Sequence, residues 1–285
     1  MSVITYKCKD DFLKENLNLL LNNESLSQLL LINVLNKDTS TLNDGFIMGK
    51  VTKRNNETSL IFVNAIPFNL NIFSPEDTID ISAVKELACY IGSNNIPING
   101  INSNKAICNI FIKQYKAITN ITLREHLAMD IMELRQLSNI SLPKGTFRKA
   151  SLADADLLAE WFVKFYLEVL NETVNIDLAL EKIKFNISAG LTYIFDSESG
   201  QPVATASIAR KLTKGCSINL VYTDNKFRGH QYGTAVVYYL SQLSLANNND
   251  FCSLFVDKYN PISNKMYKKI GYKIIDNNYD YRINC

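Results

Sequence analysis

The spacing of apolar residues along the chain predicts an alternation of helices and strands. Apolar residues that recur at every third or fourth position indicate helices, and short apolar runs between polar turns indicate strands. The Leu-rich span 17–35 is interrupted by Asn22, Asn23, Glu24 and Asn33, so it predicts two amphipathic core helices rather than a membrane span, which needs about 20 mostly apolar residues. The first half continues with strands at 45–51, 59–65 and 67–73, helices at 79–91 and 105–118, and a long strand at 121–134.

The sequence Pro143-Lys144-Gly145 interrupts this pattern and predicts a domain boundary, so we expect one domain at 1–143 and a second at 144–285. In the second half the pattern predicts strand 146–149, helices 154–170 and 176–188, strands 191–195, 202–209 and 218–223, helix 232–245, strand 251–256, helix 261–270, and strands 272–275 and 280–283. Helices and strands thus both occur throughout the chain, which indicates an α/β fold class.

A strand, a glycine-containing turn and a helix follow one another between Asn219 and Leu245. The strand ends in Val221-Tyr222-Thr223, the turn reads Arg228-Gly229-His230-Gln231, and the helix begins at Tyr232-Gly233. The first turn of a helix has unpaired N–H groups and the positive end of the helix dipole, so a pyrophosphate can bind there. Arg228 would supply a fixed cation, and the glycines would let the backbone approach phosphate oxygens.

Downstream of this turn the chain reads Asn260-Pro261-X-Ser263-Asn264-X-X-Tyr267-X-X-X-Gly271-Tyr272. Together, the two motifs resemble the GNAT (GCN5-related N-acetyltransferase) superfamily over roughly the C-terminal half of the chain. The resemblance implies an acyl-CoA N-acyltransferase fold with a mixed sheet at 144–285. The first half has a similar mix of elements and no counterpart of the phosphate turn, so it resembles a degenerate lobe of the same fold, as in two-lobed bacterial acetyltransferases.

The resemblance also implies which residues contact acetyl-CoA. The strand pairs with the pantetheine arm and splays from its neighbour, the turn wraps the pyrophosphate, and the strand backbone supplies donors for the oxyanion. The residues that it assigns to the cofactor are Leu220, Val221, Tyr222, Arg228, Gly229, His230, Gln231, Tyr232, Gly233, Thr234, Asn260 and Asn264. Gln231 departs from the family, which usually has glycine there, and this departure costs about 1 kcal/mol if the position needs a positive φ.

Tyr267 occupies the position of the family's proton donor. We expect it to lie beside an apolar helix stripe of Ile262, Met266 and Ile270, with a core aromatic as the alternative role. Asn260 before Pro261 is a strong helix N-cap, and whether it also contacts the cofactor is open.

The general base has only weak candidates in the sequence, namely Asp224, Asp257 and Glu160. Each is also explained as a turn residue, a cap or an exposed charge, and a water chain can take the proton instead. A Ser/Cys-His hydrolase is disfavoured because the chain has only His126 and His230 and no G-x-S-x-G elbow.

Composition limits the remaining choices. The chain has 285 residues and a formal charge of +2 without a dense Lys/Arg block, so neither nucleic acid nor an anionic membrane is expected as a partner. Its six cysteines are scattered, which argues against a metal site or a disulfide framework, and no signal peptide is expected, so we expect a cytoplasmic protein.

The sequence therefore predicts an N-acetyltransferase that uses acetyl-CoA and no metal, and transfers the acetyl group directly to a primary amine of a small molecule or amino acid in a ternary complex. A protein or peptide N-acetyltransferase and a non-catalytic acyl-CoA-binding module remain alternatives. Whether the chain forms a homodimer is also open.

Overall fold

The computed structural model describes residues 1–36 and 46–283, and the chain forms two compact units. Unit 1 comprises Met1–Asp130 and Asp276–Cys285, and unit 2 comprises Ile131–Ile275. These units differ from the expected division after residue 143 in two ways: the chain passes from unit 1 to unit 2 after Asp130, and the end of the last strand belongs to unit 1. Gly45, the expected first residue of a strand, and Cys285 lie outside the described residues.

Unit 1 begins with a strand and a helical pair, continues with three antiparallel strands and ends in two strand–helix steps. Its elements are β1 (Ser2–Tyr6), α1 (Lys9–Asn22), α2 (Glu24–Leu35), β2 (Ile47–Thr52), β3 (Thr58–Asn64), β4 (Leu70–Phe73), α3 (Ile81–Ser93), β5 (Gly100–Ser103) and α4 (Lys105–Thr119). Strand β6 (Leu123–Leu134) runs across the boundary between the units.

The central strand β3 shows how unit 1 buries both faces of its sheet. Leu60 and Phe62 pack in the core that α3 and α4 cover, whereas Ile61 and Val63 pack in the core that α1 and α2 cover. Because successive side chains of a strand point to opposite faces, burial of both faces explains the uninterrupted apolar run of β3.

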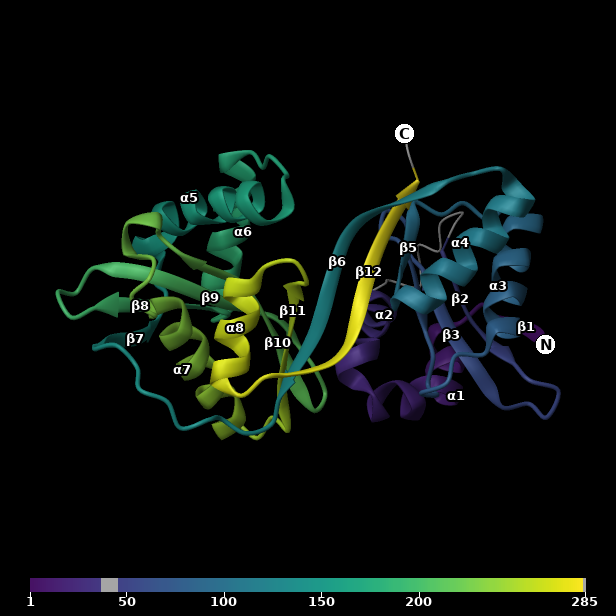
Figure 1. The fold of residues 1–285 in the computed structure, drawn as a ribbon, viewed down its shortest axis with the longest axis horizontal. Coiled ribbons are helices and arrows are strands. Elements are labelled where there is room, and N and C mark those ends of the chain that lie inside the picture. The colour runs from purple at the N-terminus through teal and green to yellow at the C-terminus, as the bar shows by residue number, and fades with distance from the viewer. Residues whose placement is uncertain (37–45, 284–285) are drawn as a thin grey trace. The chain divides into compact units, whose positions relative to one another are not determined.

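Unit 2 repeats the same order of elements. They are β7 (Gly145–Lys149), the 3-10 turn η2 (Leu152–Asp154), α5 (Ala155–Phe165), the π-helix η3 (Tyr166–Leu170), α6 (Ile176–Ser188), β8 (Thr192–Ser197), β9 (Pro202–Lys211), β10 (Gly215–Thr223), the 3-10 turn η4 (Asn225–Phe227), α7 (Tyr232–Ala246), β11 (Phe251–Asp257), α8 (Pro261–Ile270) and the start of β12 (Lys273–Ile283), whose residues from Asp276 belong to unit 1. Helices α5 and α6 cover one face of the sheet, and α7 and α8 cover the other (Figure 1).

The two units also share their strand pairing. Strands lie in the order β1-β2-β3-β4-β5 in unit 1 and β11-β10-β9-β8-β7 in unit 2. The pairs β4–β5 and β10–β11 are parallel, and the meander strands before them pair antiparallel. The expected mixed α/β fold with tandem lobes is therefore confirmed, although the sequence shows no direct repeat.

Several expected elements have other bounds in the structure. Strands β1 and β5 were not expected, because both are short, and strand β4 starts at Leu70 because a turn occupies 66–68. The expected strands 272–275 and 280–283 form the single strand β12, whose residues 279–282 pair antiparallel with β5 in unit 1. The expected helix 154–170 changes to a π-helix after Phe165.

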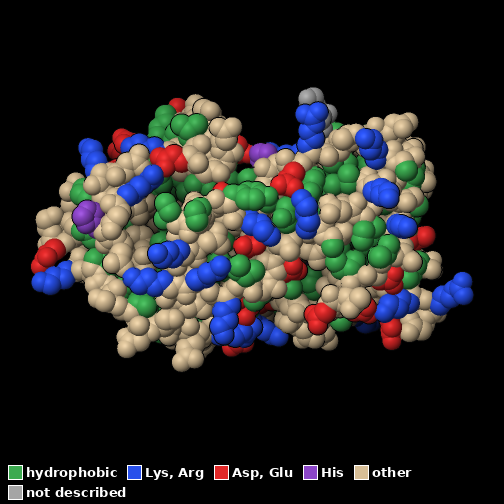
Figure 2. All heavy atoms as spheres, viewed as in Figure 1, with side chains coloured by type: hydrophobic (Ala, Val, Ile, Leu, Met, Phe, Trp, Pro, Cys, Tyr) green, Lys and Arg blue, Asp and Glu red, His purple; other side chains and the backbone are tan. Residues whose placement is uncertain are grey.

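The surface carries mixed charge. Figure 2 shows both Lys and Arg and Asp and Glu side chains on the face in view. No helix in the two described ranges is long and apolar enough to cross a membrane.

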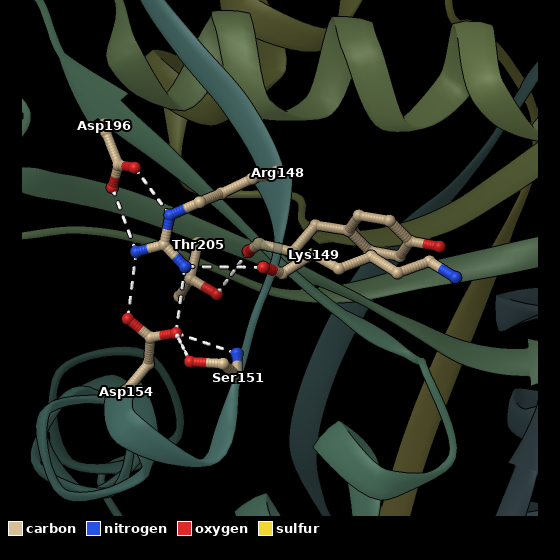
Figure 3. A network of polar contacts seen from close by, with 7 residues as sticks. Arg148, Lys149, Ser151, Asp154, Asp196 and Thr205 are labelled. Atoms are coloured by element: carbon tan, nitrogen blue, oxygen red, sulfur yellow. Dashed lines mark hydrogen bonds and ion pairs between the residues drawn. The ribbon is translucent and has the colours of Figure 1, made fainter.

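An ion-pair network fixes the start of α5 to the edge of the sheet in unit 2. Arg148 of β7 donates to both carboxylate oxygens of Asp154 at 2.9 Å and to Asp196 of β8 at 2.5 and 3.2 Å (Figure 3). Asp154 also accepts the Ser151 N–H at 2.8 Å. The Arg148 guanidinium holds the pKa of Asp154 at about 2, despite the opposing effect of burial.

We predict that Arg148→Met destabilises the protein by about 2 kcal/mol at neutral pH, because two largely buried carboxylates lose their cation. A lowered Asp pKa stabilises the fold above the unfolded pKa of about 4, and this stabilisation is lost as pH falls toward 2. The gap between wild type and variant should therefore narrow below about pH 4. Thermal unfolding at neutral and acidic pH measures both effects.

The matched control is Lys144→Met, which removes the exposed ion pair with Glu198 and should leave the unfolding temperature unchanged. Equal shifts for the two variants would contradict the role assigned to Arg148.

Candidate functional site

The parallel strands β10 and β11 pair over only part of their length. Their register runs from Gly215 opposite Phe251 to Ile218 opposite Leu254, whereas β10 continues to Thr223 and β11 to Asp257. The carboxyl ends of the two strands therefore lack mutual pairing, so backbone groups of β10 are available to a ligand between the strands.

A β-bulge reshapes β10 at the same place. Asn219 pairs with Ser207 of β9 and Tyr222 pairs with Thr205, which leaves Leu220 and Val221 out of register. Leu220 has φ +49°, a left-handed conformation that costs a non-glycine residue about 1–2 kcal/mol. Such bulges redirect the backbone and are common beside active sites.

The turn after β10 leads into helix α7, whose first N–H groups have no side-chain acceptor. Gly229 has φ +85° and Gln231, which precedes α7, has φ +63°, so the turn uses the left-handed conformation at both positions. No side chain caps α7, as is also the case for α1, α2 and α5, whereas Asp or Asn side chains cap α3, α4, α6 and α8. The first intrahelical bond is from Ala235 N–H to the Gln231 carbonyl, so the N–H groups of 232–234 have no intrahelical acceptor.

Gly233 allows this helix start to pack closely against the strand. A Cβ at Gly233 would lie 2.9 Å from Oγ1 of Thr223 and 3.5 Å from Sδ of Met266. Gly229, in contrast, has open space around it, so its backbone conformation rather than space calls for glycine.

Arg228, the first residue of this turn, forms an ion pair with a carboxylate that sequence reasoning missed. Its Nη2 is 2.6 Å from Oε2 of Glu168 in η3, and its Nε donates to the Thr223 carbonyl at 3.1 Å. The Tyr222 hydroxyl donates to Oε1 of Glu168 at 3.2 Å. Burial, followed by the Glu168 charge, raises the pKa of Tyr222 to about 12, so this phenol stays protonated. Only the unusual π-helix marks Glu168 as special, and no sequence motif does.

A narrow cavity lies between α5, α6 and the bulged part of β10. Aromatic side chains form much of its wall, and its volume is about 10 Å³, room for about one water molecule. The lining residues are Leu158, Trp161, Phe162, Phe165, Ile183, Thr192, Thr205, Ser207, Leu220 and Tyr222. Leu220 and Tyr222 connect this cavity to the bulge.

Tyr267 of α8 is buried, with 7% of its surface exposed, and burial raises the pKa of its phenol. Its ring packs edge-on against Tyr272 at 5.9 Å, and its hydroxyl has no hydrogen-bond partner among the described residues. The expected apolar stripe was wrong at Ile262, which is 81% exposed, because the buried face of α8 runs through Tyr267 and Ile270.

Asn260 and Asn264 make structural bonds around the start of α8. Asn260 accepts the Ser263 N–H at 3.0 Å, as expected for an N-cap. Asn264 donates to the carbonyls of Asp257 and Asn260, both at 2.9 Å. A contact of either side chain with a cofactor stays a prediction.

The base candidates are separated in the structure. Glu160 forms a partly exposed pair with Lys164 at 3.9 Å, and Asp257 accepts the Tyr259 N–H at 2.9 Å. Asp224 accepts the Trp161 indole N–H at 3.3 Å and caps the turn η4. His230 is exposed and lies beside the ring of Tyr232. Within the described ranges, no three His, Cys, Asp or Glu side chains gather as a metal site would require.

In unit 1, side chains occupy the positions that correspond to the open helix start and the unpaired strand ends of unit 2. The loop 74–80 before α3 contains Glu76, Asp77 and Asp80 and no Lys, Arg or Gly, and Asp80 accepts the N–H groups of Ser82 and Ala83 at 3.0 and 3.1 Å. Ser103 of β5 donates to the Ile72 carbonyl of β4 at 2.6 Å, which bridges the parallel strands. Lys53 pairs with Glu76 at 2.7 Å, and the Asp80 carboxylate occupies the N–H groups at the start of α3, so this helix start is not open to an anion.

The two units also differ at their second strand–helix step, which is β5–α4 in unit 1 and β11–α8 in unit 2. Tyr267 follows the cap Asn260 of α8 by seven residues, and Phe111 follows the cap Asn104 of α4 by the same number. Phe111 is fully buried and has no hydroxyl to donate. The features of a candidate active site therefore occur together in unit 2.

Comparison with known proteins agrees with this geometry. Residues 155–272 match the model of the Acetyltransferase (GNAT) family. The chain is similar in fold to a GNAT-family acetyltransferase from Colwellia psychrerythraea, at 11% identity over 100% of both chains with a TM-score of 0.54. It is also similar to a GCN5-related N-acetyltransferase from Sphaerobacter thermophilus, at 12% identity over 90% of this chain and 84% of that chain with a TM-score of 0.60.

A Drosophila protein shows the same fold at 13% identity, over 99% of this chain and 98% of that chain, with a TM-score of 0.60. No curated protein matches the chain. The whole-chain likeness to these structures agrees with two lobes of one fold.

The left-handed conformation at Gln231 generates a prediction about stability. Replacement by glycine relieves about 1 kcal/mol of strain but frees the unfolded chain by a similar amount, so Gln231→Gly should change stability little. Gln231→Val places a β-branched residue in the same conformation and should destabilise the protein by about 1–2 kcal/mol. Chemical denaturation measures the free energy of unfolding of both variants. A valine variant as stable as the glycine variant would contradict the assigned backbone conformation.

Proposed function

We propose that the protein transfers an acetyl group from acetyl-CoA to a primary amine of a small molecule or amino acid, directly in a ternary complex, because residues 155–272 match the model of the Acetyltransferase (GNAT) family. The observation that carries this proposal is the conjunction of unpaired strand ends, an uncapped helix start and a buried tyrosine with an unpaired hydroxyl, all within unit 2.

The residues present fit acetyl-CoA. The N–H groups at the start of α7, together with Arg228, are suited to a pyrophosphate, and the unpaired part of β10 is suited to the amide-containing pantetheine arm. The bound cofactor supplies an activated acetyl thioester. No protein nucleophile is needed, because the acceptor amine itself attacks the carbonyl carbon.

Two groups of the chain are proposed to assist this transfer, one by stabilising the oxyanion and one by protonating the leaving thiolate. The backbone of Leu220 and Val221 lies at the bulge and is proposed to donate to the oxyanion that forms on the carbonyl oxygen. Tyr267 is proposed to give its phenolic proton to the leaving sulfur when the carbon–sulfur bond breaks, and the proton lost by the amine restores the balance through solvent. The raised pKa of Tyr267 keeps the phenol protonated at neutral pH, as an acid requires.

We propose that the acceptor approaches from the side of α5 and α6, where the cavity adjoins Leu220 and Tyr222. The five cysteines in the described ranges have free thiols, which supports a reducing cytoplasm as the site of action.

For Tyr267→Phe we expect unchanged affinity for acetyl-CoA and a fall in turnover of about 10²- to 10⁴-fold, because the leaving thiolate loses its acid. Calorimetry measures affinity, and release of free CoA thiol measures turnover. Tyr259→Phe is the matched control, because Tyr259 is 71% exposed, and it should retain full activity. Full turnover in Tyr267→Phe would remove Tyr267 from the mechanism.

The acceptor class is tested with labelled acetyl-CoA and a panel of amines, amino acids and peptides, followed by mass spectrometry. Acetylation of small primary amines in preference to peptides supports the proposal. Preferential labelling of peptides would identify a protein N-acetyltransferase, and acetyl-CoA binding without any transfer would identify a binding module.

A further inference from the structure

Glu168 connects three parts of the candidate site. It lies in η3, the π-helical end of the segment that leads from α5 to α6, and its two carboxylate oxygens contact different partners. Oε2 pairs with Nη2 of Arg228 at 2.6 Å, and Oε1 accepts the Tyr222 hydroxyl at 3.2 Å. The turn 228–231 and the bulged strand β10 therefore both contact η3 through the carboxylate of Glu168.

The contacts continue from Tyr222 into α5. The guanidinium of Arg228 lies 5.4 Å from the centre of the Tyr222 ring, and that ring lies 6.0 Å from the ring of Trp161. The Trp161 indole donates to Asp224, the residue that caps the turn η4. A change at Arg228 can therefore reach Trp161 through Glu168 and Tyr222.

The charge at Arg228 is already neutralised by Glu168. A cation that binds a pyrophosphate does so more weakly when a carboxylate lies 2.6 Å away, because the carboxylate repels the phosphate and competes for the same N–H donors. Glu168 and Arg228 are both partly exposed, at 34% and 48% of their side chains, so both can change partners without unfolding the core.

We propose that Glu168 is a positioning residue that competes with the cofactor pyrophosphate for Arg228, so that binding at the phosphate turn is coupled to the α5–α6 segment. This inference depends on the proposed function, because it requires an acyl-CoA at the turn. When Arg228 turns to the pyrophosphate, Glu168 is released from it, and the contact between η3 and the Tyr222–Trp161 pair changes.

The test compares acetyl-CoA binding by wild type, Glu168→Gln, Arg228→Gln and the double variant. Removal of the competing charge should tighten binding about three- to tenfold in Glu168→Gln, the scale of a partly exposed charge pair. The same change should have no effect in the Arg228→Gln background, where the competed cation is absent. Calorimetry at two salt concentrations measures these affinities, and the gain should shrink at high salt.

The coupling has its own readout, because Trp161 is the single tryptophan of the chain. Its fluorescence should change when acetyl-CoA binds to wild type and should change less in Glu168→Gln, in which the charged contact is already lost. Glu181→Gln removes an exposed carboxylate of α6 and is the matched control for both readouts.

The outcomes separate the two proposals. Weaker or unchanged binding by Glu168→Gln overturns the competition, as does an equal gain in the Arg228→Gln background or in Glu181→Gln. Absence of acetyl-CoA binding by wild type overturns the proposed function itself. If Glu168 had only a structural role, Glu168→Gln would have a lower unfolding temperature and no higher affinity for acetyl-CoA.

Discussion

The incomplete pairing of the parallel strands β10 and β11 is the constraint on which the site depends. Strand pairing normally satisfies the backbone donors and acceptors of a sheet interior, and here it stops at Ile218 and Leu254. The bulge at Leu220 extends the same departure toward β9. Without this incomplete pairing, β10 would be hydrogen-bonded on both sides. The backbone donors that we propose for the pantetheine arm and the oxyanion would then be occupied.

The rest of the site is arranged around this opening. Gln231 adopts a strained conformation to start α7 without a side-chain cap, which leaves N–H groups for an anion. Tyr267 reaches the buried face of α8 with its hydroxyl unpaired. Unit 1 has the same order of elements but lacks these features. Asp80 caps its helix α3, Ser103 bonds to the neighbouring strand, and Phe111 takes the place of a tyrosine. A shared fold is therefore compatible with different local chemistry in its two copies.

Much of the fold could be predicted from the sequence because long amphipathic helices and buried strands have strong periodic signals. The turn at 228–233 was also recognisable, since glycine spacing and Arg228 carry local chemistry. Short strands β1 and β5 lack such signals, and the pairing of β12 with β5 depends on contacts distant in sequence. Glu168 was missed for the same reason, because its partners Tyr222 and Arg228 are more than fifty residues away along the chain.

The most direct measurement is the stoichiometry of acetyl-CoA binding by calorimetry, with charge reversal in each unit as a probe. We predict one bound cofactor per chain. Its affinity should fall strongly in Arg228→Glu, within the turn of unit 2, and should not change in Lys53→Glu, which replaces the partner of Glu76 in unit 1. Two cofactors per chain, or binding that depends on Lys53 rather than Arg228, would contradict the assignment of the site to the open strands and helix start of unit 2.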